Sequence, residues 1–209
     1  MARSKIIAVV GVDGSGKTSQ ARRLAARLAA SGVPARYFEN AGGRPTIARF
    51  AQRFGRPDGI ALLGRGGYLT FEATVRFLAL TRALLWSRVT GEVAVMDRFA
   101  YCQYAMMRAR GHRGERAVRT LYAVFGRPDL TCFFDVSPAQ AQQRVEQRGR
   151  DSEELDYLAA LDAAYRSLPE YREWTIVDAA GSEDEVETEL GRIVAARLGL
   201  PAEDVGCPS

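Results

Sequence analysis

The sequence has little cysteine and almost no histidine. The three cysteines, Cys102, Cys132 and Cys207, are an odd number and stand at spacings that match no metal site. The single histidine, His112, lies among glycines and arginines in "RARGHRGER". We therefore expect reduced thiols and a solvated loop histidine, and we look for the chemistry of this chain in other residue types.

Long hydrophobic runs are also missing. No apolar stretch reaches the roughly 18 residues that span a membrane, and the apolar part of "MARSKIIAVVG" is too short for a signal peptide. A chain of 209 residues, with 47% hydrophobic and 26% charged residues, is typical of one soluble domain. We expect a cytoplasmic protein without a membrane partner, with its domain at 1–200 and a frayed tail at 201–209.

Lysine is the third scarce residue type. The net charge is +4 and the pI about 9.1, yet the basic residues are 27 arginines and only two lysines, Lys5 and Lys17. The arginines are spread along the chain without a basic block or an aromatic stacking motif, so we expect no nucleic-acid partner. A phosphorylated small substrate explains the positive charge equally well. Because lysine is so rarely used for surface charge here, we expect Lys17 to have a function.

The sequence does contain a regular alternation of strands and helices. Apolar runs bounded by turn residues predict strands at about 5–10, 33–38, 92–96, 130–135 and 174–178. Their nearly continuous apolar character is typical of a parallel sheet that is covered on both faces. Helical patterns lie at 17–32, 68–89 and near 101–110, 114–125, 137–147, 153–167 and 183–198. This order indicates a doubly wound α/β domain with ligands at the carboxyl ends of its strands.

One connection between these elements is unusually rich in glycine. It is the segment 55–67, "GRPDGIALLGRGG". Two interpretations stay open, a loop that folds over a ligand and a flexible surface loop.

The strongest motif is a phosphate-binding loop at residues 11–18. "GVDGSGKT" matches G-x-x-x-x-G-K-[ST] and stands between a predicted strand and a predicted helix. In this motif the glycines let backbone N–H groups point at a phosphate, the lysine reaches the β and γ oxygens, and the threonine offers its hydroxyl to Mg²⁺. Lys17 is thus a predicted catalytic residue and Thr18 a predicted metal ligand. The predicted ATP-binding residues are Gly11, Val12, Asp13, Gly14, Ser15, Gly16, Lys17 and Thr18.

The rest of the sequence favours a kinase over a nucleotide switch. A GTPase needs a guanine-reading N-K-x-D segment, and neither Lys5 nor Lys17 follows an asparagine. A D-x-x-G at 178–181 comes after the last predicted strand, too late to sense a γ-phosphate. An ATP-driven motor usually needs a longer chain. A small kinase remains, which must bind a second substrate and bring several positive charges onto the transferring group.

Two arginine-bearing segments supply such charges. In "VAVMDRF", at the end of a strand, we expect Asp97 to hold Mg²⁺ or its water and Arg98 to grip a phosphate; a surface ion pair is the alternative. In "AQQRVEQRGRDSEELDYL", Arg144, Arg148 and Arg150 flank a glycine. They suit a mobile lid at about 144–153 that closes and brings an arginine to the transition state; a solvated helix face is the alternative.

The order and spacing of these segments resemble one known family. "GVDGSGKT", "FLALTR", "DRF", "FFDVSPAQAQQR", "RGRDSEE" and "IVDAAGSEDEV" follow one another over nearly the whole chain, as in the thymidylate kinase family of P-loop nucleoside monophosphate kinases. The resemblance implies an α/β P-loop fold in three layers, with a five-stranded parallel sheet flanked by helices and a short arginine-bearing lid. It also implies a homodimer and Mg²⁺-dependent transfer of the ATP γ-phosphate to dTMP or a closely related pyrimidine monophosphate.

The resemblance further implies roles for single residues. Asp13 would face the acceptor sugar or phosphate, Arg98 would hold the acceptor phosphate, and Arg82, which ends "FLALTR", would approach the base. Because residue 14 is glycine rather than arginine, the catalytic arginine would come from the lid. The "DAAGS" loop at 178–182 would lie near adenine.

The departures from the family pattern lie in the acceptor pocket. "FENAGGR" lacks the usual R-E-P-G-G or F-P-x segment, and Arg44 stands in for the missing charge. Leu78 occupies the place of a stacking phenylalanine, and Gln103 is placed to hydrogen-bond a pyrimidine edge. The acceptor-binding residues inferred in this way are Asp13, Arg44, Leu78, Arg82, Arg98 and Gln103. Two alternatives stay open, a kinase of the same fold for another nucleoside or nucleotide in specialised metabolism, and a nucleotide-binding regulator without transferase activity.

Overall fold

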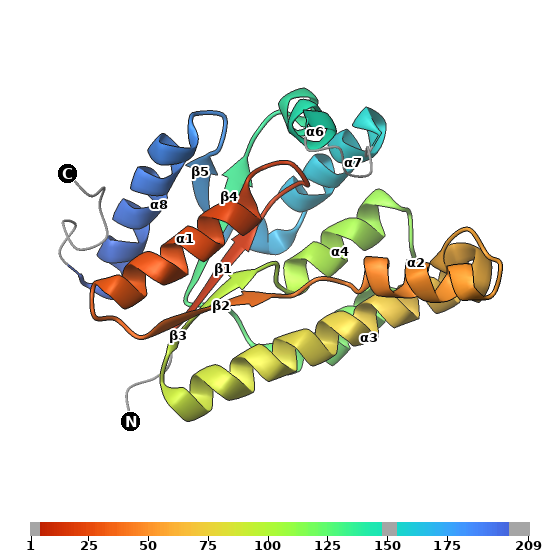
Figure 1. The fold of residues 1–209 in the computed structure, drawn as a ribbon, viewed down its shortest axis with the longest axis horizontal. Helices are drawn as coiled ribbons and strands as arrows, with labels where there is room; N and C mark the ends of the chain where they lie inside the picture. Colours follow the sequence, from red (N-terminus) through yellow and green to blue (C-terminus); the bar gives the residue numbers. More distant parts are fainter. Residues whose placement is uncertain (1–4, 148–153, 201–209) are drawn as a thin grey trace.

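The structure, a computed structural model, describes residues 5–147 and 154–200. Its described residues form one sheet of five parallel strands in the order β2-β3-β1-β4-β5 (Figure 1). The strands are β1 (Ile6–Val10), β2 (Ala35–Glu39), β3 (Val93–Asp97), β4 (Leu130–Asp135) and β5 (Thr175–Asp178). The predicted parallel sheet is therefore confirmed, with each strand close to its predicted bounds.

The register of the strands brings their carboxyl ends to one edge. β1 pairs with β3 so that Val9 lies beside Asp97, and it pairs with β4 so that Val10 lies beside Phe133. β2 pairs with β3 so that Glu39 also lies beside Asp97. Every residue of β3 is buried, as expected for a strand covered on both faces. The loops after β1, β2 and β3 consequently meet at the edge where an open α/β sheet binds its ligands.

Helices cover both faces of the sheet. On one face, α1 (Lys17–Ala30) packs against α8 (Glu183–Leu198); on the other lie α3 (Gly59–Thr90), α4 (Ala100–Ala109) and α7 (Leu155–Arg166) (Figure 1). Right-handed crossovers require this division, because the chain moves one way along the sheet from β1 to β2 and the other way from β2 to β5. In the described ranges, no helix combines the length and apolar character needed to cross a membrane.

The remaining helices include one that the sequence did not predict. α2 (Arg44–Arg53) follows β2, with a proline in its first turn, where proline favours a helix start. The side chain of Arg44 lies outside what the structure describes, so its acceptor role stays a prediction. The other elements are α5 (Glu115–Tyr122), α6 (Pro138–Gln147) and short 3-10 turns at Ala123–Phe125 and Pro169–Glu173.

The glycine-rich segment 55–67 is largely helical, which corrects the expectation of a loop. α3 begins at Gly59, and the Asp58 carboxylate caps it by accepting from the Ala61 N–H at 2.7 Å. Gly64 then interrupts the helix with φ 69° and ψ 168°, which lie outside the helical region. α3 is thus two helical pieces joined at Gly64, of which the second contains the predicted helix 68–89.

The core fixes the sheet against α4 and α7. Phe133 of β4 packs against the rings of Tyr165 and Trp174, with centroid distances of 5.6 Å and 6.1 Å. Burial of each such ring contributes about 1.5–3 kcal/mol. Cys102 and Cys132 are buried and unpaired, as predicted, and Cys207 lies outside the described residues. This packing gives the loops at the carboxyl edge of the sheet a rigid support.

Candidate active site

The phosphate-binding loop joins β1 to α1, and at two of its glycines there is no room for a side chain. Its glycines take positive φ angles, 145° at Gly11, 89° at Gly14 and 87° at Gly16, which other residues rarely adopt. A Cβ at Gly14 would lie 2.2 Å from the carbonyl oxygen of Ala141 in α6, and a Cβ at Gly11 would lie 2.8 Å from that of Phe134. Such a loop can bring its own backbone close to a phosphate. The α6 contact also explains why residue 14 carries no arginine.

Lys17 is the first residue of α1, and its side chain is 4% exposed. Its Nζ donates to Val12 O at 2.5 Å and Ser15 Oγ at 3.3 Å, and lies 3.9 Å from Asp13 Oδ1. Burial lowers the pKa of Lys17, and the neighbouring Asp13 carboxylate opposes that effect. The ammonium therefore lies over the loop, where the motif places the β and γ oxygens of a nucleotide.

Thr18 and Asp97 meet between α1 and β3. Thr18 Oγ1 donates to Asp97 Oδ2 at 2.5 Å, and Tyr37 OH donates to the same oxygen at 3.2 Å. Asp97 is 2% exposed, and its Oδ1 has no hydrogen-bond partner among the described residues. A buried carboxylate oxygen with free lone pairs beside a hydroxyl fits Mg²⁺, which takes few protein ligands and adds water and phosphate oxygens.

The other metal-binding residue types do not gather anywhere in the described part of the chain. It contains no group of three or more His, Cys, Asp or Glu side chains that could hold an ion. A metal bound by Thr18 and Asp97 would therefore depend on nucleotide phosphates for most of its ligands. This dependence is typical of Mg²⁺ in phosphoryl-transfer sites.

Arg98 directly follows β3 in a strained conformation. Its φ is 76°, in the left-handed region, although it is not a glycine. Its N–H donates to Val9 O at 3.0 Å, and its carbonyl accepts from Asn40 Nδ2 at 2.8 Å. Its guanidinium donates to Asp13, and this carboxylate raises the pKa of Arg98 well above its ordinary value. Strain of this kind costs about 1–3 kcal/mol and is concentrated at functional sites.

Arg76 of α3 is buried beside Gln103 and Asn40, and no motif of the sequence pointed to it. Arg76 is 2% exposed; its Nε donates to Gln103 Oε1 at 3.1 Å and its Nη1 to Asn40 O at 2.9 Å. Glu72, one helical turn earlier, is fully buried and pairs with Arg110 at 3.2 Å. A glutamate and an arginine at i and i+4 on the apolar face of a long helix were the signal available in the sequence.

Leu78 and Arg82 lie on other faces of α3. Leu78 is 61% exposed, and Arg82 lies over the Phe38 ring of β2, 6.0 Å from its centroid. Phe77 packs into an aromatic cluster of the core. Six residues separate Arg82 from Arg76, which rotates it by about 240° around the helix axis. The structure therefore brings Arg76, and not Leu78 or Arg82, next to Asn40 and Gln103.

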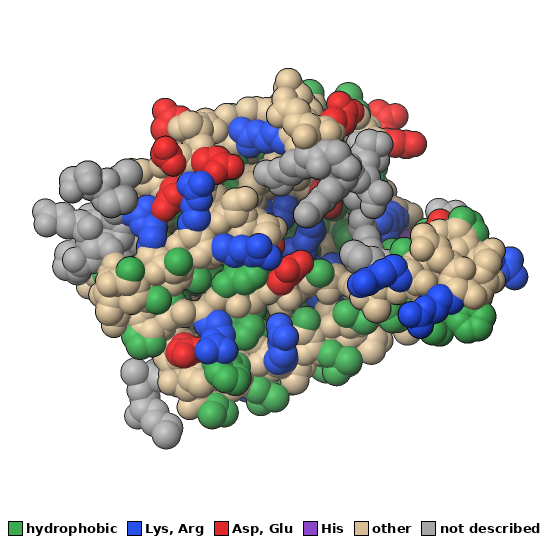
Figure 2. All heavy atoms as spheres, in the orientation of Figure 1, with side chains coloured by type: hydrophobic (Ala, Val, Ile, Leu, Met, Phe, Trp, Pro, Cys, Tyr) green, Lys and Arg blue, Asp and Glu red, His purple; other side chains and the backbone are tan. Residues whose placement is uncertain are grey.

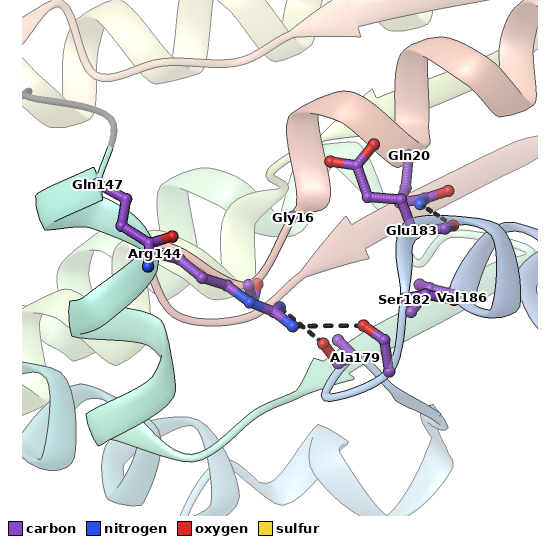
Figure 3. Close-up of a pocket in the computed structure, with 10 residues that line it drawn as sticks. Gly16, Gln20, Arg144, Gln147, Ala179, Ser182, Glu183 and Val186 are labelled. Carbon is purple, nitrogen blue, oxygen red and sulfur yellow. Dashed lines mark hydrogen bonds between the residues drawn. The ribbon is translucent and has the colours of Figure 1, made fainter.

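Arg144 holds the loop that follows β5. Its guanidinium donates to the carbonyl oxygen of Ala179 at 2.7 Å (Figure 3). It also donates to the carbonyl oxygens of Ala180 at 3.1 Å and Gly181 at 3.4 Å. A pocket of about 370 Å³ lies between this loop and the start of α1, within the size range of small-ligand sites. Arg148 and Arg150, with the rest of the predicted lid after residue 147, lie outside the described residues.

One wall of this pocket comes from α1. Gln20 Nε2 donates to Glu183 O at 2.7 Å, and both residues line the pocket beside Gly16 of the phosphate loop (Figure 3). The 178–182 loop, expected near adenine, is bonded by Arg144 of α6, and Glu183, which follows the loop, is bonded by Gln20 of α1. This pocket suits the nucleoside part of a nucleotide whose phosphates lie on the loop.

Comparison with known proteins agrees with this geometry. Residues 9–190 match the family model described as thymidylate kinase. A thymidylate kinase of Burkholderia vietnamiensis is 32% identical over 219 residues, which cover 94% of this chain and 100% of that protein. One of Pseudomonas syringae pv. tomato is 30% identical over 204 residues, 93% of this chain and 96% of that protein. A probable thymidylate kinase of Archaeoglobus fulgidus is 29% identical over 198 residues, 93% and 97% respectively. The chain therefore belongs to the thymidylate kinase family.

Proposed function

We propose that this protein is an ATP-dependent kinase that transfers the γ-phosphate of ATP to dTMP and releases dTDP and ADP. The contact between Asp13 and Arg98 carries the proposal, because it joins the donor phosphate loop to an arginine at the neighbouring strand end. Family membership supports dTMP as the acceptor. An acceptor oxygen attacks the γ-phosphorus while the bond to the bridging oxygen of ADP breaks.

The donor side orients ATP and neutralises its charge. Lys17 would bind the β and γ oxygens, and Thr18 and Asp97 would supply the protein oxygens that hold Mg²⁺. When bound, Mg²⁺ neutralises charge on the same phosphates. Arg144 holds the loop next to the nucleoside pocket, so it positions ATP without touching the reacting atoms. Arg148 and Arg150 remain the candidates for an arginine that reaches the transferring group.

On the acceptor side, we expect Arg98 to bind the phosphate and residues of α3 and α4 to contact the base. Arg98 is aimed by its ion pair with Asp13 and is suited to bidentate binding of the dTMP phosphate. Asn40 bonds both Arg98 and Arg76, so it links the proposed phosphate-binding residue to the buried guanidinium of α3. Gln103 remains the residue that we expect to hydrogen-bond a pyrimidine edge, and its contact with Arg76 supports the proposal by fixing its side chain.

Charge argues against an unphosphorylated acceptor. The guanidiniums of Arg76, Arg98 and Arg110 are assigned to the acceptor side, where Arg98 pairs with Asp13 and Arg110 with Glu72. Guanidiniums enclosed with an uncharged ligand would lose hydration without gaining a new anionic partner. A phosphorylated acceptor supplies that partner. A regulator that only binds nucleotide would have no use for this second positive site.

We also propose that two copies associate through α3. Leu78, Leu85 and Val89 are 61%, 54% and 84% exposed and recur at helical spacing along one stripe. Figure 2 has hydrophobic side chains along the lower edge of the molecule, over α3. An exposed apolar stripe of this kind is typical of a protein interface. Light scattering at micromolar concentration should give the mass of a dimer, and Leu85→Glu should give a monomer.

Product analysis tests the proposed reaction directly. The full chain is incubated with ATP, Mg²⁺ and a panel of nucleosides and nucleoside monophosphates, and ADP release is followed together with product masses. We expect dTDP from dTMP at the highest rate. ATP that binds without any transfer would favour the regulator, and a product from another acceptor alone would favour a specialised kinase.

A further inference from the structure

A second pocket, of about 460 Å³, lies at the amino edge of the sheet. It is lined by Leu130 and Thr131 at the start of β4, by Thr175 at the start of β5, and by the end of α8, which packs against β5 (Figure 1). The phosphate loop and Arg98 follow the carboxyl ends of their strands, at the opposite edge. A strand of this sheet separates the two edges by about 13–20 Å. The proposed reaction therefore makes no use of this cavity, which we call the amino-edge pocket.

Three side chains of the amino-edge pocket are buried and yet have a polar group without a partner. Tyr101, Thr131 and Trp174 line it and are 6%, 7% and 8% exposed. Within residues 5–147 and 154–200, neither hydroxyl makes a hydrogen bond, and the indole N–H makes none either. In contrast to the enclosed Tyr157 OH, each of these three groups keeps accessible surface. Since the side chains are otherwise buried, we infer that this surface faces the pocket.

These three groups select a ligand with hydrogen-bond acceptors. The indole N–H of Trp174 can only donate, so an amine or a metal ion cannot satisfy it. Burial raises the pKa of Tyr101 to about 12, so its hydroxyl keeps its proton at neutral pH and can donate as well. A buried donor without a partner is costly, and an acceptor oxygen that enters the pocket removes that cost.

The charged residues of the pocket favour an anionic acceptor. Its two carboxylates already have partners, because Glu173 pairs with Arg127 at 2.5 Å and Asp129 Oδ2 accepts from the Ile6 N–H at 2.9 Å. Arg197 Nε donates to Asp129 O at 2.8 Å, but its guanidinium forms no ion pair with a carboxylate in the described ranges. An entering anion would give this guanidinium its missing partner.

We propose that the amino-edge pocket binds a small carboxylate with an apolar body. The carboxylate oxygens accept hydrogen bonds from the unpartnered donors and from Arg197, and the apolar body contacts Leu130 and Ile193, which also line the pocket. The volume of the pocket suits such a molecule, because small-ligand sites combine apolar walls with a few polar groups that fix orientation. This binding is independent of the proposed function.

Trp174 makes the binding measurable by fluorescence. The chain has two tryptophans, and Trp86→Phe, at a half-exposed position of α3, leaves Trp174 as the only one. Three probes with one ring and different head groups are titrated into this variant without nucleotide: 3-phenylpropanoate, 3-phenylpropanamide and 3-phenylpropylamine. Calorimetry on the wild-type chain measures the same three dissociation constants without the substitution.

We expect 3-phenylpropanoate to change the Trp174 emission saturably, with a Kd at least about tenfold lower than that of the amide or the amine. Equal dissociation constants for the three probes would overturn the proposal, and so would tighter binding of the amine. Calorimetric binding of 3-phenylpropanoate that leaves the Trp174 emission unchanged would place the anion elsewhere and also overturn it.

Variants that remove single hydroxyls test which groups hold the anion. Tyr101→Phe and Thr131→Val should each raise the Kd of 3-phenylpropanoate by at least about threefold. Tyr104→Phe is the matched control, since Tyr104 is equally buried on the same helix but does not line the pocket. It should leave the Kd unchanged. Equal effects of Tyr101→Phe and Tyr104→Phe would contradict the assignment.

Two substitutions on the exposed side of the pocket complete the test. Ala196→Phe, at an exposed position of α8, fills the pocket with a ring and should abolish the Trp174 response. Arg197→Gln removes the unpaired charge and should bring the dissociation constants of 3-phenylpropanoate and its amide within about threefold of each other. Both positions are exposed, so we expect wild-type circular dichroism spectra. A carboxylate that still binds normally to folded Ala196→Phe protein would overturn the proposal.

Discussion

Arg98 and Asp13 are 85 positions apart in the sequence and form an ion pair in the structure. Asp13 belongs to the loop between β1 and α1, and Arg98 follows β3, the strand next to β1. The pair joins the loop proposed to bind the donor phosphates to the arginine proposed to bind the acceptor phosphate. It also explains why Arg98 tolerates a φ of 76°, because Asp13, Val9 and Asn40 all hold it.

Lys17→Ala should lower kcat/KM at least about 100-fold, or about 2.7 kcal/mol of transition-state stabilisation, because no other lysine lies near the loop. Lys5→Ala, at an exposed site before β1, is the matched control and should leave kcat/KM unchanged. Steady-state rates of ADP release measure both. A folded Lys17→Ala protein with nearly normal turnover would remove Lys17 from the mechanism.

Gly14→Ala and Gly16→Ala separate two kinds of strain in the phosphate loop. Both glycines have positive φ, but a Cβ at Gly16 meets nothing within 4 Å, whereas at Gly14 it meets Ala141 O at 2.2 Å. Gly16→Ala should lower the free energy of unfolding by about 1–2 kcal/mol. Gly14→Ala should cost at least about 1 kcal/mol more, because α6 must move. Urea denaturation measures both, and equal losses would mean that α6 yields freely.

Arg144→Ala should raise the KM for ATP about tenfold with kcat within about twofold, because it removes three bonds to the nucleoside loop and no contact to the reacting atoms. Gln140→Ala is a graded control, since it removes one bond, to Ala180 O, from the same loop. In contrast, the alanine variant of Arg148 or Arg150 should lower kcat and kcat/KM by similar factors. An Arg144→Ala variant with that second pattern would make Arg144 catalytic.

Glu187 should make the contact between α1 and α8 depend on pH. Burial opposes ionisation of Glu187, but bonds from Arg23 at 2.9 Å and Arg27 at 2.6 Å outweigh it and lower its pKa. Because the folded pKa is below the unfolded value of about 4.3, the stabilisation is present above that pH and is lost as the pH falls through the folded pKa. Glu187→Gln should therefore cost about 1 kcal/mol at pH 7 and progressively less below about pH 4.

Urea denaturation at pH 7 and pH 3 tests this expectation. Glu189→Gln is the control, because its pair with Arg192 lies on the exposed side of the same helix. It should change the free energy of unfolding by less than about 0.5 kcal/mol at either pH. A Glu187→Gln penalty that is equal at both pH values would assign the effect to packing instead of charge.

The sheet could be predicted from the sequence, and the segment between β2 and β3 could not. Buried parallel strands leave continuous apolar runs, as "VAVMD" does, and the phosphate motif marks the start of α1. In the 44–67 region, several glycines lie inside helices, although glycine usually marks a loop. Gly64 interrupts α3 without ending it. Local propensity cannot tell a helical glycine from a loop glycine here, because the packing of α2 against α3 determines which segments are helical.

The part of the candidate site that follows a phosphate-binding motif could be predicted from the sequence. The part that depends on which face of a helix a side chain occupies could be predicted less well. Because β1 and β3 are neighbouring parallel strands, the residues at and after their carboxyl ends lie together. These residues are Lys17, Thr18, Asp97 and Arg98. The resemblance implied a role for Arg82, the last residue of "FLALTR", and Arg76 lies six positions earlier, on another face of the helix. The partners of Arg76 follow other strands, so its burial depends on tertiary structure alone.

The central claim is that the γ-phosphate passes to an acceptor whose own phosphate is held by Arg98. The most direct test compares kcat/KM for dTMP and thymidine in wild type and in Arg98→Ala, with ATP saturating and products identified by mass. We predict that wild type prefers dTMP by at least about 100-fold and that Arg98→Ala loses most of this preference while its KM for ATP stays unchanged. Preferential phosphorylation of thymidine by wild type, or an unchanged preference in Arg98→Ala, would contradict the account.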